Sequence, residues 1–263
     1  MNPLKNMFTH FINPMDKGIT PFLDAFESIT LAEMEGVKLL DRTDTKFVFN
    51  AKLLPVVLDS LSEYYKILDV NGIKQNRYET LYFDTPNFKL YHDHHNGRIN
   101  RYKVRYRKYV DSDLVFFEVK YKNNKGRTIK SRINRKSIQE VIEGKSIAFI
   151  NEKTSLQAEA LQSKLWVNYS RITLVNKVTT ERLTIDLDLE FKKDEQVQNF
   201  PSLVIAEIKQ EKAGPSPFLK VMKKNHIREG SISKYCFAVV SLMNGIKKNK
   251  FKSNLLTLKK LAA

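Results

Sequence analysis

Polar and apolar residues alternate along much of the chain from about residue 36 onward, and this period of two is typical of half-buried β-strands. The pattern first appears at 39–49, where Arg42, Asp44, Lys46 and Val48 fall on alternate positions. It returns at 65–70, 77–84, 98–110, 114–122, 127–135, 167–178, 181–191 and 203–210. About eight long antiparallel strands with few helices predict an α+β fold, in which an eight-stranded barrel is closed or nearly closed and flanked by helices.

The intervening segments predict helices, turns and three regions of the chain. Helices are expected at 51–65, 136–144, 153–164 and 231–245, together with a short one that ends near His226. HDHHNG (92–97) and KNNKG (122–126) predict turns, and GPSP (214–217) predicts a break. We therefore expect a helical N-terminal extension (1–35), a barrel domain (36–246) and a basic C-terminal tail (247–263), which is frayed or forms a short amphipathic helix.

Basic residues gather on one face of the predicted strands. Side chains two residues apart on a strand point the same way, so Arg101, Lys103, Arg105 and Arg107 share a face in RYKVRYRKY (101–109). The same rule aligns further polar residues on the later strands: Glu118, Lys120 and Lys122; Thr128, Lys130 and Arg132; Tyr169, Arg171 and Thr173; Arg182, Thr184, Asp186, Asp188 and Glu190; and Glu207 and Lys209. The opposite face is rich in leucine, isoleucine and aromatic residues, as expected for packing against helices.

The net charge of the chain indicates what kind of partner these cations would bind. The 263 residues contain 45 Lys and Arg against 29 Asp and Glu, a formal charge of +16, and such an excess indicates a polyanionic partner. A polar face that simply meets water is the plainer explanation, but a solvent face normally mixes charges of both signs. If the barrel closes with this face inward, the cations converge on a wet lumen that suits phosphate. The acids among them would pair with the cations, or one or two would hold Mg²⁺ or Mn²⁺.

The sequence also bears on location. The chain has one cysteine, Cys236, and so cannot form a disulfide within itself. Its N-terminal apolar stretch is broken by polar residues and Pro14, and no window approaches the roughly 20 apolar residues that a membrane span needs. We expect a cytoplasmic protein; the alternative is a peripheral protein that the lysines of the tail bring to the inner face of an anionic membrane.

Taken in order, these motifs resemble the triphosphate tunnel metalloenzymes of the CYTH-like superfamily, and among them the polyphosphate polymerase domain of the vacuolar transporter chaperone (VTC) family. The resemblance covers residues 39–238. It rests on RTDTKFVF, ETLYFDTPNFKLY, KVRYRKY, FFEVKYK, GRTIKSR, NYSRIT, ERLTIDLDL, AEIK and SISKY. It implies an eight-stranded antiparallel tunnel, in which the terminal phosphate of ATP extends a polyphosphate chain with the help of Mn²⁺ or Mg²⁺.

The resemblance also implies roles for individual residues. The tunnel's phosphate-binding cations match Lys46, Arg105, Arg107, Lys120, Lys130, Arg171, Arg182 and Lys234. Tyr169 matches a phosphate-contacting tyrosine, Ser233 belongs to the terminal motif, and Glu207 matches the metal-holding glutamate. Arg132 and Lys209 share the cationic face and are expected to contact the substrate. Relatives outside the polymerase branch open with E-x-E-x-K; Arg42 occupies the first of those slots, which argues against the cyclase and thiamine triphosphatase branches.

Other functions remain open at this point. A tunnel-type inorganic triphosphatase or polyphosphatase would use the same cations, and a non-catalytic polyphosphate-binding protein would need no reaction at all. A specific nucleic-acid binder is disfavoured because Tyr102, Tyr106, Phe117 and Tyr121 fall on the face opposite the cations, where they cannot stack bases beside them. The histidines of 92–97 could suggest a metal, but a solvated loop is the simpler interpretation. Coupling to a membrane would require partner proteins, and the oligomeric state is not predicted.

Overall fold

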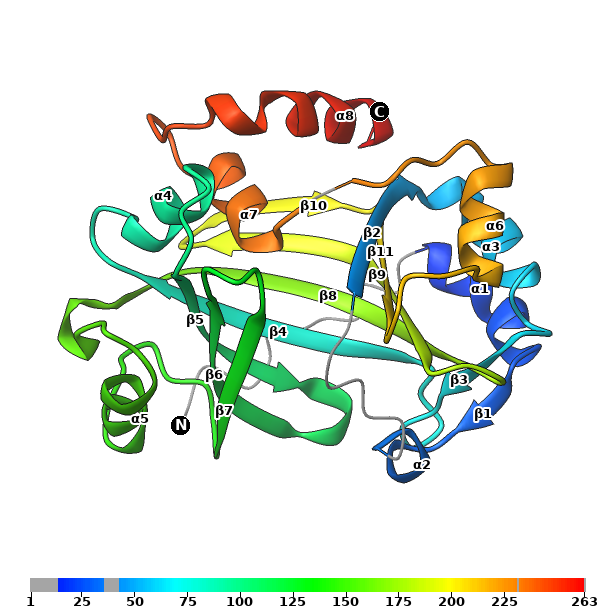
Figure 1. The fold of residues 1–263 in the computed structure, drawn as a ribbon, viewed down its shortest axis with the longest axis horizontal. Coiled ribbons are helices and arrows are strands. Elements are labelled where there is room, and N and C mark those ends of the chain that lie inside the picture. The colour runs from blue at the N-terminus through cyan, green and yellow to red at the C-terminus, as the bar shows by residue number, and fades with distance from the viewer. Residues whose placement is uncertain (1–13, 36–42, 231, 263) are drawn as a thin grey trace.

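A computed structural model describes residues 14–35, 43–230 and 232–262, so Arg42 and the predicted boundary at 35/36 lie outside or at the edge of the described residues (Figure 1). Its centre is one large sheet, in which eight antiparallel strands follow the order β2-β11-β9-β8-β4-β5-β6-β7. These strands are β2 (Thr43–Asn50), β4 (Gln75–Asp84), β5 (Arg101–Tyr109), β6 (Leu114–Lys122), β7 (Thr128–Arg135), β8 (Gln162–Asn176), β9 (Glu181–Lys193) and β11 (Leu203–Gln210). The expected α+β class and antiparallel sheet are confirmed.

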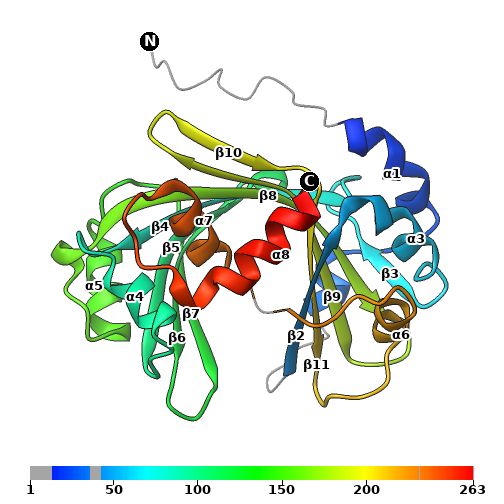
Figure 2. The same cartoon turned by 90° about the horizontal axis from the view of Figure 1, so that it is seen from above.

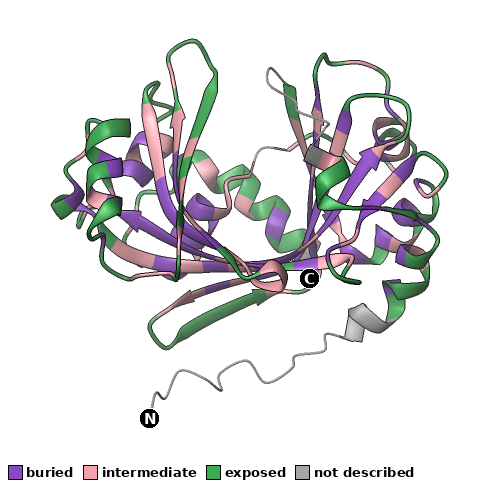
Figure 3. Cartoon of the chain, turned by 90° about the horizontal axis from the view of Figure 1, so that it is seen from below, coloured by how far each residue is buried: buried purple, intermediate pink, exposed green. Residues whose placement is uncertain are grey.

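The sheet curls into an open trough rather than a closed barrel (Figure 2). Its end strands, β2 and β7, form no ladder with each other among the described residues. The free edge of β2 is instead taken by the loop before residue 231: the Gly230 amide donates to the Lys46 carbonyl at 2.9 Å, and Glu229 bridges to Phe47. The other end strand, β7, is largely exposed, whereas buried residues run along the middle of the sheet (Figure 3).

Short strands extend this sheet at its margins. β3 (Tyr65–Leu68) pairs with β8, and β1 (Glu27–Ile29) adds to β3 in parallel. β10 (Gln196–Phe200) folds back on β9 as a hairpin. The period-two pattern does not predict β1 or β10.

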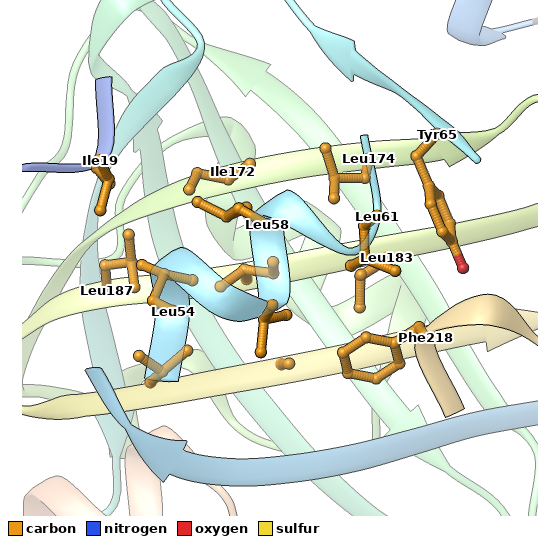
Figure 4. Close-up of a cluster of buried hydrophobic side chains, with 14 of the residues drawn as sticks. Ile19, Leu54, Leu58, Leu61, Tyr65, Ile172, Leu174, Leu183, Leu187 and Phe218 are labelled. Carbon is orange, nitrogen blue, oxygen red and sulfur yellow. The ribbon is translucent and has the colours of Figure 1, made fainter. Parts of the chain in front are cut away.

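Helices cover the convex face of both walls of the trough. α1 (Pro14–Asp24), α3 (Leu54–Asp59) and α6 (Pro217–Lys224) pack on the wall made by β2, β11 and β9, where Leu58, Leu61 and Phe218 are fully buried (Figure 4). α5 (Lys145–Lys153) packs on the other wall through Phe149 and Ile150. The leucine- and aromatic-rich faces of the strands are therefore the outer faces, as predicted.

Three helix and turn predictions are wrong. The predicted helix at 136–144 is irregular, and the one at 153–164 is reduced to the short 3₁₀ helix η3 (Ala158–Ala160) before β8; the α-helix of this region is α5, which lies between the two predicted segments. The predicted turn at 92–97 lies largely in α4 (Lys89–His95). This helix starts there because the carboxylate of Asp84 accepts the amides of Leu90 and Tyr91 at 2.8 and 2.9 Å. His95 is 2% exposed, so this histidine is packed rather than solvated.

A β-bulge changes which face the acids of β9 occupy. The register between β8 and β9 shifts at Asn168/Ser170, and Asp188 has a φ of +52°. Asp188 accepts hydrogen bonds from Ser170 at 2.6 Å and Gln75 at 3.0 Å, and Glu190 accepts one from Asn168, all on the outer face. The prediction that Asp188 and Glu190 align with Asp186 is therefore wrong, because one extra residue inverts the alternation.

The C-terminal helices close one end of the trough. α7 (Lys234–Leu242) lies on the concave side and packs against β8 and β9, while α8 (Lys252–Ala262) lies farther out, near β2 and β11 (Figures 1 and 2). α2 (Leu31–Glu35) is a short helix before β2. Within the described ranges, no helix is both long and apolar enough to span a membrane.

Candidate functional site

The concave face of the sheet, here called the inner face, carries the predicted cations. Cross-strand register joins Lys103, Lys120 and Lys130 across β5, β6 and β7, and Arg105 lies beside Glu118. On the other wall Lys46 pairs with Glu207. The N-terminus of α7 reaches the same face, because Ser233 accepts a hydrogen bond from Lys103 at 2.9 Å. Strands far apart in the sequence thus bring their basic residues to one surface.

Three inner-face carboxylates each lie between two cations. Glu118 accepts Arg105 at 2.6 and 2.8 Å and Lys130 at 2.5 Å. Asp186 accepts both Nε and Nη2 of Arg171, and it also pairs with Lys234. Glu207 lies 3.5 Å from Lys46 and 3.4 Å from Lys209. Each group keeps a net positive charge, so the acids fix the cations in place without cancelling them.

The carboxylates of these groups stay ionised. Burial alone would raise the pKa of Asp186, but Arg171 and Lys234 lower it to about 2. Glu118 is fully buried, and the charges of Arg105, Arg107 and Lys130 overcome that burial and hold its pKa well below the usual range. Lys209 and Lys46 do the same for the pKa of Glu207. Opposite charge outweighs desolvation in all three cases.

Two further cations of the inner face have no carboxylate within ion-pair distance in the described part of the chain. Arg107 is 8% exposed and donates from Nε to the Thr80 hydroxyl at 3.3 Å. The charge of Arg105, followed by burial and the charge of Arg107, lowers the pKa of Lys120 well below its usual value. Glu207, on the opposite wall, acts on Lys120 in the other direction, so the two walls lie within electrostatic reach of each other. A polyanion would supply the missing counter-charge.

Stacked tyrosines form the floor under these cations. The rings of Tyr78 and Tyr169 lie 5.1 Å apart and nearly parallel. Arg171 lies 5.0 and 5.2 Å from their centres, and Lys234 lies 4.8 Å from Tyr169. The Tyr169 hydroxyl is buried and forms no hydrogen bond with any described residue. A buried hydroxyl without a partner is costly, so this group is available to a ligand oxygen.

α7 is held in a fixed position relative to the sheet. Its N-cap Ser233 accepts the Cys236 amide, and Tyr235 donates to the buried carboxylate of Asp84 at 2.5 Å. Lys234 therefore projects from the first turn of a helix, where the positive end of the helix dipole adds to the field of the inner face.

Most of the predicted site residues are brought together, and two lie apart. Arg132 is exposed on β7, with its guanidinium 4.2 Å from the centre of the Phe116 ring. Arg182 donates to the Met34 carbonyl at 3.4 Å, toward one end of the wall. The central set contains Lys46, Arg105, Arg107, Lys120, Lys130, Tyr169, Arg171, Glu207, Lys209, Ser233 and Lys234.

Several inner-face residues were not predicted. Tyr78, Thr80 and Tyr82 of β4 pair with Tyr109, Arg107 and Arg105. The same period-two rule, applied to YETLYFDT (78–85), could have found them. Phe116 also lies on the cationic face. The outer face carries Tyr102, Tyr106, Phe117 and Tyr121, as expected.

The residues of the inner face do not form a complete metal site by themselves. Within the described ranges, no three Asp, Glu, His or Cys side chains are grouped so that they could hold an ion. Glu207 is flanked by two ammonium groups. Mg²⁺ is commonly held by one or two carboxylates plus substrate phosphates. The donor set therefore fits an ion that enters with a phosphate ligand, and it does not fit one held by the protein alone.

Comparisons with known proteins show the family of the chain. No curated protein matches the chain significantly. Among solved structures, a candidate adenylate cyclase from Bacillus halodurans is 14% identical, with a TM-score of 0.48 over 73% of this chain and 94% of that one. A candidate adenylyl cyclase from Hippeastrum, described as having a dominant triphosphatase activity, is also 14% identical, with a TM-score of 0.48 over 78% of this chain and 98% of its own. The VTC domain matches residues 41–243, which include every strand from β2 to β11 and all of α7, and the chain therefore belongs to the VTC domain family.

Proposed function

We propose that this protein is a metal-dependent polyphosphate polymerase, which transfers the γ-phosphate of ATP onto a growing polyphosphate chain along the inner face. The observation that carries the proposal is a pair of cations, the buried Arg107 and the partly buried Lys120, that have no carboxylate partner in the described residues but lie among fixed ion-pair groups. Membership of the VTC domain family supports the same substrate class.

The proposed reaction needs little covalent help from the protein. A terminal oxygen of the polyphosphate chain attacks the γ-phosphorus of ATP and forms the new P–O bond. The bond from that phosphorus to the β–γ bridging oxygen breaks, and ADP leaves with the electron pair. Charge spreads over the phosphoryl oxygens in the transition state, so catalysis consists of positioning and charge stabilisation. Arg105, Arg107, Lys120 and Lys130 are the candidates on one wall, and Arg171 and Lys234 are the candidates above the tyrosine floor.

The other inner-face residues have supporting roles in this proposal. Lys46 and Lys209 hold Glu207 and extend the cationic surface along β2 and β11, while Arg132 and Arg182 would meet substrate near its ends. Tyr169 and Ser233 would offer hydroxyl groups to phosphate oxygens. Mn²⁺ or Mg²⁺ that enters on the ATP phosphates would neutralise charge there, with Glu207 as its protein ligand.

Incubation of the purified protein with ATP and Mn²⁺, followed by gel analysis for long polyphosphate, tests the proposal. We expect chains to lengthen with time and ADP to form in equal amount. Free phosphate without long chains would contradict the polymerase and indicate a tunnel-type triphosphatase, in which water replaces the chain end. Tight polyphosphate binding without ADP or phosphate would indicate a non-catalytic binder.

We do not propose a specific nucleic-acid ligand. Tyr78, Tyr82 and Tyr169 share the cationic face, but they are 8% exposed or less and lie under the cations, so successive bases could not stack on them. Equal competition by oligonucleotides and by tripolyphosphate would contradict this view.

For location, we propose a cytoplasmic protein that can touch an anionic membrane surface. The lysines near and within α8 are exposed: Lys247, Lys248, Lys250, Lys252, Lys259 and Lys260. Co-flotation with vesicles containing anionic lipid, but not with neutral vesicles, is the expected result. Association with membrane partner proteins would instead leave both kinds of vesicle unbound.

A further inference from the structure

An aromatic–guanidinium platform lies on the inner face at the opposite end of β5 from Lys103. Along β5 the inward positions run Lys103, which contacts α7 through Ser233, then Arg105, Arg107 and Tyr109. Phe116 is the cross-strand neighbour of Arg107, so it lies beside the last of the cations.

Three groups surround the ring of Phe116. Arg132 places its guanidinium carbon 4.2 Å from the ring centre. Tyr109 meets the ring edge-on at 5.8 Å. Asn134, opposite Phe116 on β7, is exposed, and its side chain forms no hydrogen bond with any described residue. Phe116 and Tyr109 are only partly buried, unlike the tyrosines of the floor.

The arrangement differs from the phosphate-binding groups in its chemistry. Arg132 forms no ion pair with any described residue, and its planar group covers an aromatic ring instead of a carboxylate. A flat guanidinium on an aromatic ring offers its other face to a second planar group, as in base recognition. An asparagine amide can donate and accept together, which matches the edge of adenine.

The platform also lies at a suitable place along the strand. Side chains two residues apart on a strand are separated by about 7 Å, so Arg107 and Arg105 follow Tyr109 at roughly 7 and 14 Å. The charges of Lys130 and Arg107 lower the pKa of the Tyr109 phenol although burial opposes this, so the platform borders the cations. A nucleotide with its base on the platform would extend its phosphates toward Arg107 and Lys120.

We propose that Phe116, Arg132 and Asn134 form a nucleobase subsite, which selects a purine nucleoside triphosphate over inorganic tripolyphosphate and holds it with its γ-phosphate directed toward α7. This inference rests on the proposed function, since it requires that the inner face bind the triphosphate.

Binding by calorimetry to two probes, ATP and inorganic tripolyphosphate, tests the subsite. Arg132→Lys keeps the charge but removes the planar group, and Phe116→Leu keeps an apolar side chain but removes the ring. We expect each change to weaken ATP binding roughly tenfold and to leave tripolyphosphate binding unchanged. Asn134→Ala should reduce the preference for ATP over CTP. Tyr121→Leu, which removes a ring from the outer face of the same strand, is the matched control and should change neither affinity.

The outcomes separate this inference from the proposed function. If wild-type protein bound neither probe, the phosphate site itself would be wrong. If both probes bound and the variants weakened them equally, Arg132 and Phe116 would belong to the phosphate site and the base subsite would be refuted. Unchanged ATP affinity in Arg132→Lys and Phe116→Leu would refute it as well.

Discussion

Glu118 and Lys120 lie two residues apart on the inner face of β6. Glu118 forms ion pairs with described residues, whereas Lys120 forms none with them. Glu118 holds Arg105 and Lys130, and these two cations, with Arg107, then surround Lys120. The same ion pairs that fix the arginine therefore leave the neighbouring lysine crowded by like charge. Crowding of like charge destabilises the ligand-free site, and a bound polyanion would relieve this repulsion.

Lys120→Met should separate binding from stability. The folded-state pKa of Lys120 lies below its unfolded value, so at pH 7 this group lowers the free energy of unfolding. We expect the variant to be at least as stable as wild type in urea, while its affinity for tripolyphosphate falls by about tenfold or more. Lys122→Met, two residues farther on the same face but exposed, is the control and should have a small effect on both. A large loss of stability in Lys120→Met would show that the lysine is structural.

Arg105 should behave differently from Lys120, because its partner is buried. Glu118 is 0% exposed, so Arg105→Met leaves a buried carboxylate with Lys130 alone, and we expect it to lower the free energy of unfolding by about 3 kcal/mol. The double variant Arg105→Met/Glu118→Leu removes both charges and should recover part of that loss. Urea denaturation of the two variants measures this, and equal midpoints for wild type and Arg105→Met would contradict the assigned ion pair.

Much of the inner face follows from the sequence, because period-two alternation survives wherever the strands are regular. β6 and β11 begin and end as the pattern predicts, and Arg105, Arg107 and Lys120 share the face assigned to them. Alternation assigns Asp188 and Glu190 to the wrong face because the bulge depends on how β9 pairs with β8, which the local sequence does not encode.

The remaining errors also come from tertiary packing. α4 begins where Asp84 captures two amides, and the carboxylate that stabilises it lies outside the segment that suggested a turn. The edge of β2 is covered by residues 229 and 230, which lie far from β2 in the sequence, so local alternation could not predict this contact. The motifs that contain Asp186 and Lys234 predict that both residues lie near the site. They do not predict the ion pair between the two, because it depends on the position of α7.

Lys209 predicts a pH dependence. Burial lowers its pKa to about 8, although Glu207 opposes the shift. As the pH rises through about 8, the free protein loses this charge, so tripolyphosphate affinity should fall between pH 7 and 9.5. The arginine of Lys209→Arg stays protonated throughout this range, so the variant should not show that part of the fall in affinity.

The stability of the ligand-free protein should change in the opposite direction. Because the folded pKa of Lys209 lies below 10.5, this group raises the free energy of unfolding as the pH increases from about 8 toward 10.5. If tripolyphosphate affinity depended on pH in the same way in wild type and in Lys209→Arg, Lys209 would not be the group that titrates near pH 8.

Glu207→Gln should remove the effect of the metal but not phosphate binding. The amide keeps the size of the side chain and loses its charge, so Lys46 and Lys209 become more available to phosphate. We expect tripolyphosphate affinity without metal to be equal or higher, and turnover of ATP with Mn²⁺ to fall at least tenfold. Glu190→Gln, on the outer face, is the control. Full activity of Glu207→Gln with Mn²⁺ would show that Glu207 is not a metal ligand.

Lys234 and Tyr235 are adjacent on α7 but should affect different properties. Lys234→Met leaves Asp186 paired with both Nε and Nη2 of Arg171, so we expect a clear loss of tripolyphosphate affinity and little change in stability. Tyr235→Phe removes a donor from Asp84, which is 0% exposed, and should lower the free energy of unfolding by about 1.5–3 kcal/mol. Because the other donors to Asp84 remain, α7 should keep its position and the folded variant should bind nearly as well as wild type. Calorimetry measures the tripolyphosphate affinity of each variant, and urea denaturation measures its free energy of unfolding. If Tyr235→Phe weakened binding as much as Lys234→Met, α7 would be a movable element whose position depends on the Tyr235–Asp84 hydrogen bond.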